Sequence, residues 1–138
     1  MASVKRYTSE DYDLVCEFVK RASGIETVNE EIIAHSDLLK NDEEVTGMVS
    51  YEQFDGLGII RYFIYNHQIN PDLLVNMFFE LYASAKAAGI NQLISMANQP
   101  YAYQLFELLG FIEVKKPTNL GESDLFKDDQ MRVMSIKF

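Results

Sequence analysis

The feature that most constrains the fold is a strand–helix–strand unit in the middle of the chain. The segment GIIRYFIYNHQ (58–68) is rich in β-branched and aromatic residues, which favour strands. A helix is expected over Pro71–Ala88, because its apolar residues recur at helical spacing and Gly89 suits a left-handed cap. The apolar segment NQLISMANQ follows it. Since strands joined through a helix in one sheet run parallel, we predict that Ile59–Asn66 and Leu93–Ala97 are parallel neighbours.

The segments on either side indicate further strands and helices. Upstream, VKRYT alternates like a strand, TSEDYDLVCEFVKRASG has an amphipathic helical pattern, and EVTGMVSYEQF alternates before the hairpin turn DGL. The segment VNEEIIAHSDLLKN is open between short helix and strand. Downstream, PYAYQLFELLG is typical of a helix, and FIEVKK and MRVMSIKF are typical of strands. A cleft is expected where Tyr65–Gln68 and Met96–Gln99 leave the carboxyl ends of neighbouring strands.

The charge balance narrows the expected partners. The chain has 138 residues, with 21 Asp and Glu against 12 Lys and Arg, for a formal net charge of −9. Nucleic acid and anionic membranes both need a basic surface, so neither is expected as a general partner. Cys16 is the single cysteine, which permits no internal disulfide and suits a reducing compartment. Because no apolar stretch has signal-peptide or bilayer-spanning length, a cytoplasmic protein is expected.

The late segment NQPYAYQLFELLGF carries a family resemblance. A signature of the GNAT superfamily of acyl-CoA-dependent N-acetyltransferases runs Asn, three residues, Ala, two residues, Leu, Tyr, three residues, Gly-Phe. Its positions are matched here by Asn98, Ala102, Leu105, Gly110 and Phe111. With the order of elements, the resemblance covers essentially the whole chain. It implies a GNAT-like α/β (α+β) fold, with a mixed, mostly antiparallel sheet and helices on both faces, in a single acyltransferase domain over residues 1–138.

The resemblance also implies acetyl-CoA as co-substrate. Pantetheine is expected along the backbone of one strand, with an asparagine nearby, and the pyrophosphate at the start of the following helix. The cofactor-binding residues implied in this way are Phe63, Ile64, Tyr65, Asn70, Leu73, Leu74, Asn98 and Phe106.

The chain departs from the family pattern where the chemistry is concentrated. The pyrophosphate loop begins with Ile69 instead of Gln or Arg, and its two glycine-type positions are Asp72 and Leu74. Phe106 aligns with the general-acid tyrosine but has no hydroxyl, and Ile59 replaces a frequent glutamate. Glycines normally let the backbone approach a phosphate closely, so weak or absent acetyl-CoA binding is expected.

Residues 70–72 have a second explanation as an ordinary helix start. Asn70 can cap the helix, Pro71 is a favourable first residue, and Asp72 complements the helix dipole. Capping alone explains all three residues, so we favour a helix start satisfied by its own side chains over a ligand site.

Three side chains are catalytic candidates. Tyr103 lies three residues before Phe106 on roughly the same helix face, where it could protonate a leaving thiolate. An ordinary half-buried aromatic is the alternative. Glu52 or His67 could deprotonate an amine, directly or through water, although edge exposure and a strand end explain them as well. Two histidines without cysteine or carboxylate at ligand spacing predict no metal site.

Two functions follow from these residues. The first is an N-acetyltransferase that moves an acyl group from acetyl-CoA to an amine or other small molecule. The second is a catalytically degenerate GNAT-fold binding or interaction module. The acceptor is not determined by the sequence, and a homodimer is left open.

Overall fold

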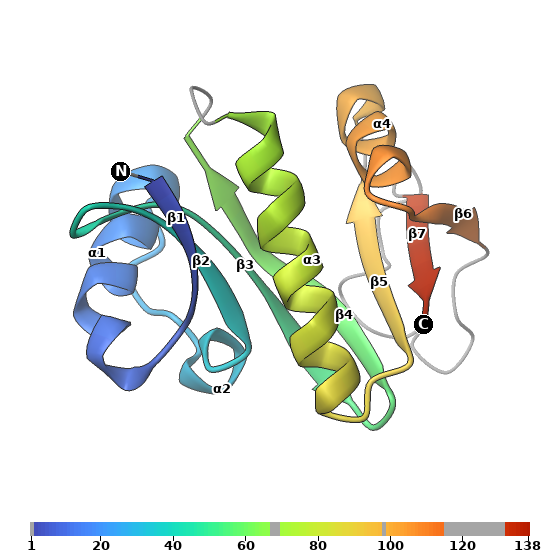
Figure 1. Ribbon diagram of the computed structural model, residues 1–138, viewed down its shortest axis with the longest axis horizontal. Coiled ribbons are helices and arrows are strands. Elements are labelled where there is room, and N and C mark those ends of the chain that lie inside the picture. The colour runs from blue at the N-terminus through green and yellow to red at the C-terminus, as the bar shows by residue number, and fades with distance from the viewer. Residues whose placement is uncertain (1, 67–69, 98, 115–131) are drawn as a thin grey trace.

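The computed structural model describes residues 2–66, 70–97, 99–114 and 132–138. Seven strands form one sheet in the order β1-β2-β3-β4-β5-β7-β6, and its helices lie on both faces (Figure 1). The strands are β1 Ala2–Arg6, β2 Ser36–Asn41, β3 Glu44–Phe54, β4 Leu57–Tyr65, β5 Gln92–Ala97, β6 Ile112–Val114 and β7 Arg132–Lys137. The helices are the short 3₁₀ helix η1 Ser9–Asp11, α1 Tyr12–Ser23, α2 Glu30–Ile33, α3 Pro71–Ala87 and α4 Pro100–Leu108.

The predicted strand–helix–strand unit is confirmed. Strands β4 and β5 are parallel neighbours joined through α3, and the other pairs in the sheet are antiparallel. The β4–β5 register covers Leu57–Ile59 against Gln92–Ile94. Beyond these residues the two strands diverge, as Figure 1 shows toward α4. The predicted mixed, mostly antiparallel sheet is therefore observed.

A β-bulge in β4 accompanies this divergence. Met48 of β3 pairs with Ile64, whereas Ser50 pairs with Arg61, so one β3 residue faces two β4 residues. The inserted pair includes Tyr62, whose φ is +43°. A positive φ is uncommon for a bulky residue, and a bulge bends its strand and increases the local twist. The bulge thus turns the second half of β4 away from β5.

The segment left open between helix and strand contains both. Asn29 caps α2, with its side chain accepting hydrogen bonds from the backbone N–H groups of Glu31 and Ile32. After α2, the chain enters β2, which pairs with β3 across a tight hairpin whose turn residue Asp42 has φ +58°. Asp is among the residues that tolerate this left-handed conformation.

Two apolar clusters fix the helices on the sheet. One cluster joins α3 and α4 to one face, and its largest fully buried side chains include Tyr51, Phe78 and Phe111. The Tyr82 hydroxyl on α3 also donates a 2.9 Å hydrogen bond to the carbonyl of Leu109, just after α4. The second cluster joins α1 to the opposite face through Val15, Phe18, Val19, Leu38, Val45 and Met48.

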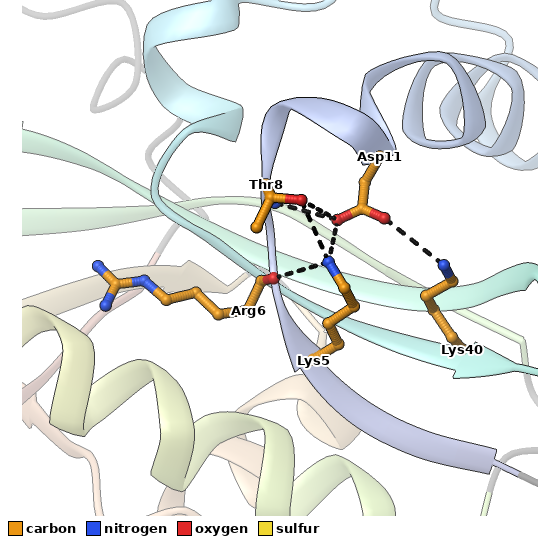
Figure 2. A network of polar contacts seen from close by, with 5 residues as sticks. All are labelled: Lys5, Arg6, Thr8, Asp11 and Lys40. Carbon is orange, nitrogen blue, oxygen red and sulfur yellow. Dashed lines mark hydrogen bonds and ion pairs between the residues drawn. The ribbon is translucent and has the colours of Figure 1, made fainter.

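A buried carboxylate ties the N-terminal strand to α1. Asp11 is 3 % exposed and makes ion pairs with Lys5 and with Lys40, the latter at 3.5 Å (Figure 2). It also accepts a 3.0 Å hydrogen bond from the Thr8 backbone N–H. Burial raises the pKa of Asp11, but the hydrogen bonds from Lys5 and Thr8 outweigh it and hold the pKa below its ordinary value. The fold therefore favours the ionised form of this carboxyl group.

Candidate functional site

A pocket of about 450 Å³ lies where β4 and β5 diverge. Its walls come from both faces of the sheet, because α4 packs on the α3 face and α1 on the other. The lining residues are Ala22, Ile60, Arg61, Tyr62, Phe63, Ile64, Tyr65, Ser95, Met96, Tyr101, Ala102, Leu105 and Phe106. The pocket thus connects the two faces through the gap in the sheet.

The β4 backbone forms one wall of this pocket. Residues 60–65 all line it, and none of them has a registered partner in β5. Buried or half-buried backbone groups need hydrogen-bond partners, so the open edge of a strand can accept an extended ligand as an added strand. The structure therefore brings Phe63, Ile64 and Tyr65 together along one pocket wall.

Aromatic side chains form an apolar part of the same site. The Phe63 ring lies 5.0 Å from Phe78, 5.8 Å from Phe106 and 5.1 Å from Tyr65, measured between ring centroids. Phe106 is 4 % exposed, so its ring both closes the core and faces the pocket. This arrangement makes one end of the cavity apolar.

The start of α3 is satisfied by its own side chains, as predicted. The Asn70 side-chain oxygen accepts a 2.9 Å hydrogen bond from the backbone N–H of Asp72. Leu74 is 7 % exposed and packs in the core, while Leu73 is half-buried against the same cluster. Asp72 is exposed in the first turn. This helix end consequently presents the Asp72 carboxylate to solvent, while the two leucines pack toward the core.

Tyr103 and Tyr101 have different surroundings on α4. The Tyr103 ring is half-buried, with the guanidinium carbon of Arg132 at 4.5 Å from its centroid. Tyr101 is 67 % exposed and is the tyrosine of α4 that lines the pocket. Residues two apart on a helix point about 200° apart, so the two hydroxyls lie on different sides of α4. The sequence analysis did not identify Tyr101, because no local sequence pattern shows which side of a short helix faces a pocket.

Glu52 lies beside the pocket in a second hollow. Its carboxylate accepts a 2.5 Å hydrogen bond from Nη1 of Arg61, and both side chains are about one-third exposed. This second hollow, of about 640 Å³, is lined by Asn29, Glu31, Ile32, His35, Glu52, Gln53 and Asp55. The Arg61–Glu52 pair therefore separates the two cavities.

The remaining predicted site residues, His67 and Asn98, lie outside the described residues. Within the described ranges, no group of three or more His, Cys, Asp or Glu side chains is placed to hold a metal ion. None of the helices in the described part of the chain has the length and apolar character needed to cross a membrane.

Comparison with known proteins links the fold to acetyltransferases. No protein-family model matches the sequence, and no curated protein matches it either. Among solved structures, the GNAT domain of S. lividans PAT superposes with a TM-score of 0.73 at 11% identity, over 99% of this chain and 90% of that chain. The PaiA N-acetyltransferase of Thermoplasma acidophilum, in complex with coenzyme A, gives 0.70 at 12% identity, over 100% and 99%.

A larger enzyme contains the same fold as a part. The N-acetylglutamate synthase of Neisseria gonorrhoeae, complexed with coenzyme A and N-acetyl-glutamate, gives a TM-score of 0.71 at 14% identity. The match covers 99% of this chain but 35% of that chain, so this protein spans about a third of the synthase. The chain therefore has the GNAT fold, and these structural neighbours are acetyltransferases, two of which were solved with coenzyme A.

Proposed function

We propose that this protein is an acyl-CoA-dependent N-acyltransferase that acetylates a small amine. The observation that supports it most is the open β4 edge along a pocket that reaches both faces of the sheet. An extended pantetheine chain, whose amides donate and accept hydrogen bonds, suits such an edge. An amine can then approach the thioester from the opposite face.

The reaction needs one bond to form and one to break. The acceptor nitrogen attacks the thioester carbonyl, the C–S bond breaks, and the amide product and CoA thiol form. The nitrogen loses a proton and the thiolate gains one. The chain's contribution is to position both molecules, exclude water beside Phe63 and Phe106, and hold or move these protons.

The two proton transfers require an acid that protonates the thiolate and a base that deprotonates the amine. Tyr101 is the first proposed proton donor to the thiolate because it lines the pocket. Tyr103, predicted from the sequence, is the second candidate, since its ring packs against Arg132 on another side of α4. Glu52 and His67 are the proposed bases for the amine. Separate Tyr103→Phe and Tyr101→Phe variants test the donor. A fall in kcat with unchanged acetyl-CoA affinity identifies it, because the phenol hydroxyl is needed for proton transfer and not for binding.

A binding module that has lost catalysis is the second candidate. It is favoured by Phe106, which has no hydroxyl, and by Asp72, which is exposed at the helix start. A carboxylate there repels a pyrophosphate. Acetyl-CoA affinity should therefore be weaker than that of an enzyme with small residues at these positions.

Calorimetric titration with acetyl-CoA and with S-acetylpantetheine separates the two candidates. S-acetylpantetheine has the thioester arm but no pyrophosphate. The Asp72→Asn variant removes the opposing charge, and we expect about two- to fivefold tighter acetyl-CoA binding with S-acetylpantetheine unchanged. Asp13→Asn is the matched control, because Asp13 is the exposed acid in the first turn of α1.

The outcomes are distinct. Thioester binding with perturbed backbone amides in residues 62–65, followed by acetyl transfer, supports the transferase. Lack of binding by either compound at millimolar concentration contradicts it and leaves the module. Equal effects of Asp72→Asn and Asp13→Asn would show that the pyrophosphate does not sit at α3.

A further inference from the structure

Arg61 is the one charged side chain among the described residues that line the β4–β5 pocket. The other lining residues are apolar, tyrosine or serine. A cation at this position is notable because the whole chain carries a net charge of −9. Its side chain is 33 % exposed, so the guanidinium is accessible to a small ligand.

The position of Arg61 separates it from the CoA phosphates. Arg61 pairs with Ser50, and directly opposed residues share a face of the sheet. Ser50 and Met48 are two residues apart on β3 and therefore share a face, and Met48 packs in the α1 cluster. Arg61 consequently points to the face opposite α3. Along β4, Arg61 also lies four residues before Tyr65, the last residue of the strand, and the pyrophosphate is proposed to lie beyond that end, at the start of α3. The guanidinium therefore lies on the face of the sheet from which, in the proposed function, the acceptor amine approaches the thioester.

The guanidinium is only partly engaged by its ion pair. Nη1 donates to one oxygen of Glu52, at 2.5 Å, and neither Nη2 nor Nε takes part in this bond. An arginine fork can hold a carboxylate through two parallel hydrogen bonds. Because the Glu52 side chain is itself 32 % exposed, a ligand carboxylate can bind Arg61 beside it or in its place.

We propose that Arg61 determines acceptor specificity by binding a carboxylate of the acceptor. The acceptor class is then a small amine that also carries a carboxylate, such as an amino acid. This inference rests on the proposed transferase function. An amine without the carboxylate meets a like charge at Arg61 and leaves the arginine fork unused, so the pocket selects against it.

Matched pairs of ligands test this assignment without any acyl donor. Tyrosine with tyramine, and histidine with histamine, differ only in the carboxylate. NMR titration of the full chain at pH 8 gives the Kd ratio within each pair. We expect the carboxylated member of at least one pair to bind tenfold tighter or more, because its carboxylate can accept two charge-assisted hydrogen bonds from Arg61. Arg61→Gln should remove this preference, and Arg61→Lys should restore part of it.

Two further variants exclude a purely structural role. Arg21→Gln removes another half-exposed arginine, which pairs with Glu44 at 3.3 Å outside the β4–β5 pocket, and should leave the ratio unchanged. Glu52→Gln removes the competing charge and should tighten binding of the carboxylated member about two- to fivefold. A structural pair would lower the melting temperature in both Arg61 and Glu52 variants without moving the ratio.

The result that overturns the assignment is a ratio near one in every pair, or no detectable binding of any member. A ratio that persists in Arg61→Gln overturns it as well. Failure of the transferase proposal is read separately, from the absence of acetyl-CoA binding and of acetyl transfer in the unaltered protein.

Discussion

Asp37 should make the stability of this protein fall as pH rises toward neutrality. Its side chain is 1 % exposed, and neither carboxylate oxygen has a hydrogen-bond partner in the described part of the structure. It faces the α3 side of the sheet with Tyr51, whose buried hydroxyl also has no partner among the described residues. The nearby charges are Arg6, its cross-strand neighbour on β1, and Glu80 on α3.

These surroundings raise the pKa of Asp37 to about 7. Burial is the main cause, the negative charge of Glu80 adds to it, and Arg6 acts in the opposite direction. A carboxyl whose pKa is higher in the folded state binds more protons there than in the unfolded chain. Its contribution to stability is therefore fully present below the unfolded pKa of about 3.9 and is lost as pH rises through about 7.

The size of the loss follows from the shift. About three pKa units at 1.36 kcal/mol each correspond to ~4 kcal/mol, of which ~3 kcal/mol is lost between pH 5 and pH 8. Asp37→Asn keeps the shape and cannot ionise. In urea unfolding, we expect the variant to gain ~3 kcal/mol relative to the unaltered protein between pH 5 and pH 8.

Asp11 provides a control with the opposite sign. Its pKa is lowered, so its contribution is present above the unfolded pKa and lost as pH falls through the folded pKa. As pH rises, Asp11→Asn should therefore lose stability relative to the unaltered protein, whereas Asp37→Asn should gain it. Parallel stability curves for Asp37→Asn and the unaltered protein over pH 5–8 would refute the reasoning, since they would mean that Asp37 is equally ionised in both states.

Three other substitutions test the pocket and the β4 strand that forms one of its walls. Phe106→Tyr places a hydroxyl at the position where the resemblance implies a general-acid tyrosine and should raise kcat for the proposed acetyl transfer about tenfold or more; an unchanged kcat would show that this proton transfer is not limiting. Gly58→Ala places a Cβ at 2.7 Å from Leu93 Cδ2 and should cost about 1–3 kcal/mol in urea unfolding, whereas an unchanged midpoint would contradict tight β4–β5 packing. Tyr62→Phe removes the hydroxyl that accepts the Asn29 backbone N–H at 3.0 Å and should cost about 0.5–1.5 kcal/mol; no loss would show that water replaces it.

The strand–helix–strand unit was predictable because local periodicity determines it. The predicted helix over Pro71–Ala88 differs from the observed α3 by one residue, and its cap at Asn70 follows from side-chain chemistry alone. The hairpin turn between β3 and β4 was equally predictable from the sequence, because Asp-Gly is a strong turn signal. Features that depend on neighbouring residues in the sequence are thus well predicted.

The geometry of the pocket depends instead on contacts between distant segments. The bulge in β4 places a positive φ on Tyr62, and no local pattern marks a tyrosine for that conformation. The pairing of Arg61 with Glu52 requires the β3–β4 register, and the burial of Asp37 requires α3 to cover β2. In SDLLKN, Asp37 has the appearance of an ordinary polar strand residue. These side chains were missed because tertiary packing, and not local propensity, determines their surroundings.

In the proposed transferase, three features would act on different parts of the reaction, which makes their effects separable. The open β4 edge would hold the thioester arm, and its geometry comes from the bulge at Tyr62. Asp72 would oppose the phosphates at the far end of the same ligand and change affinity through charge. Phe106 would limit proton transfer and change kcat through its missing hydroxyl. A protein that binds S-acetylpantetheine, binds acetyl-CoA weakly, and gains kcat in Phe106→Tyr would be a slow enzyme. One that binds neither compound would have kept the fold for another ligand.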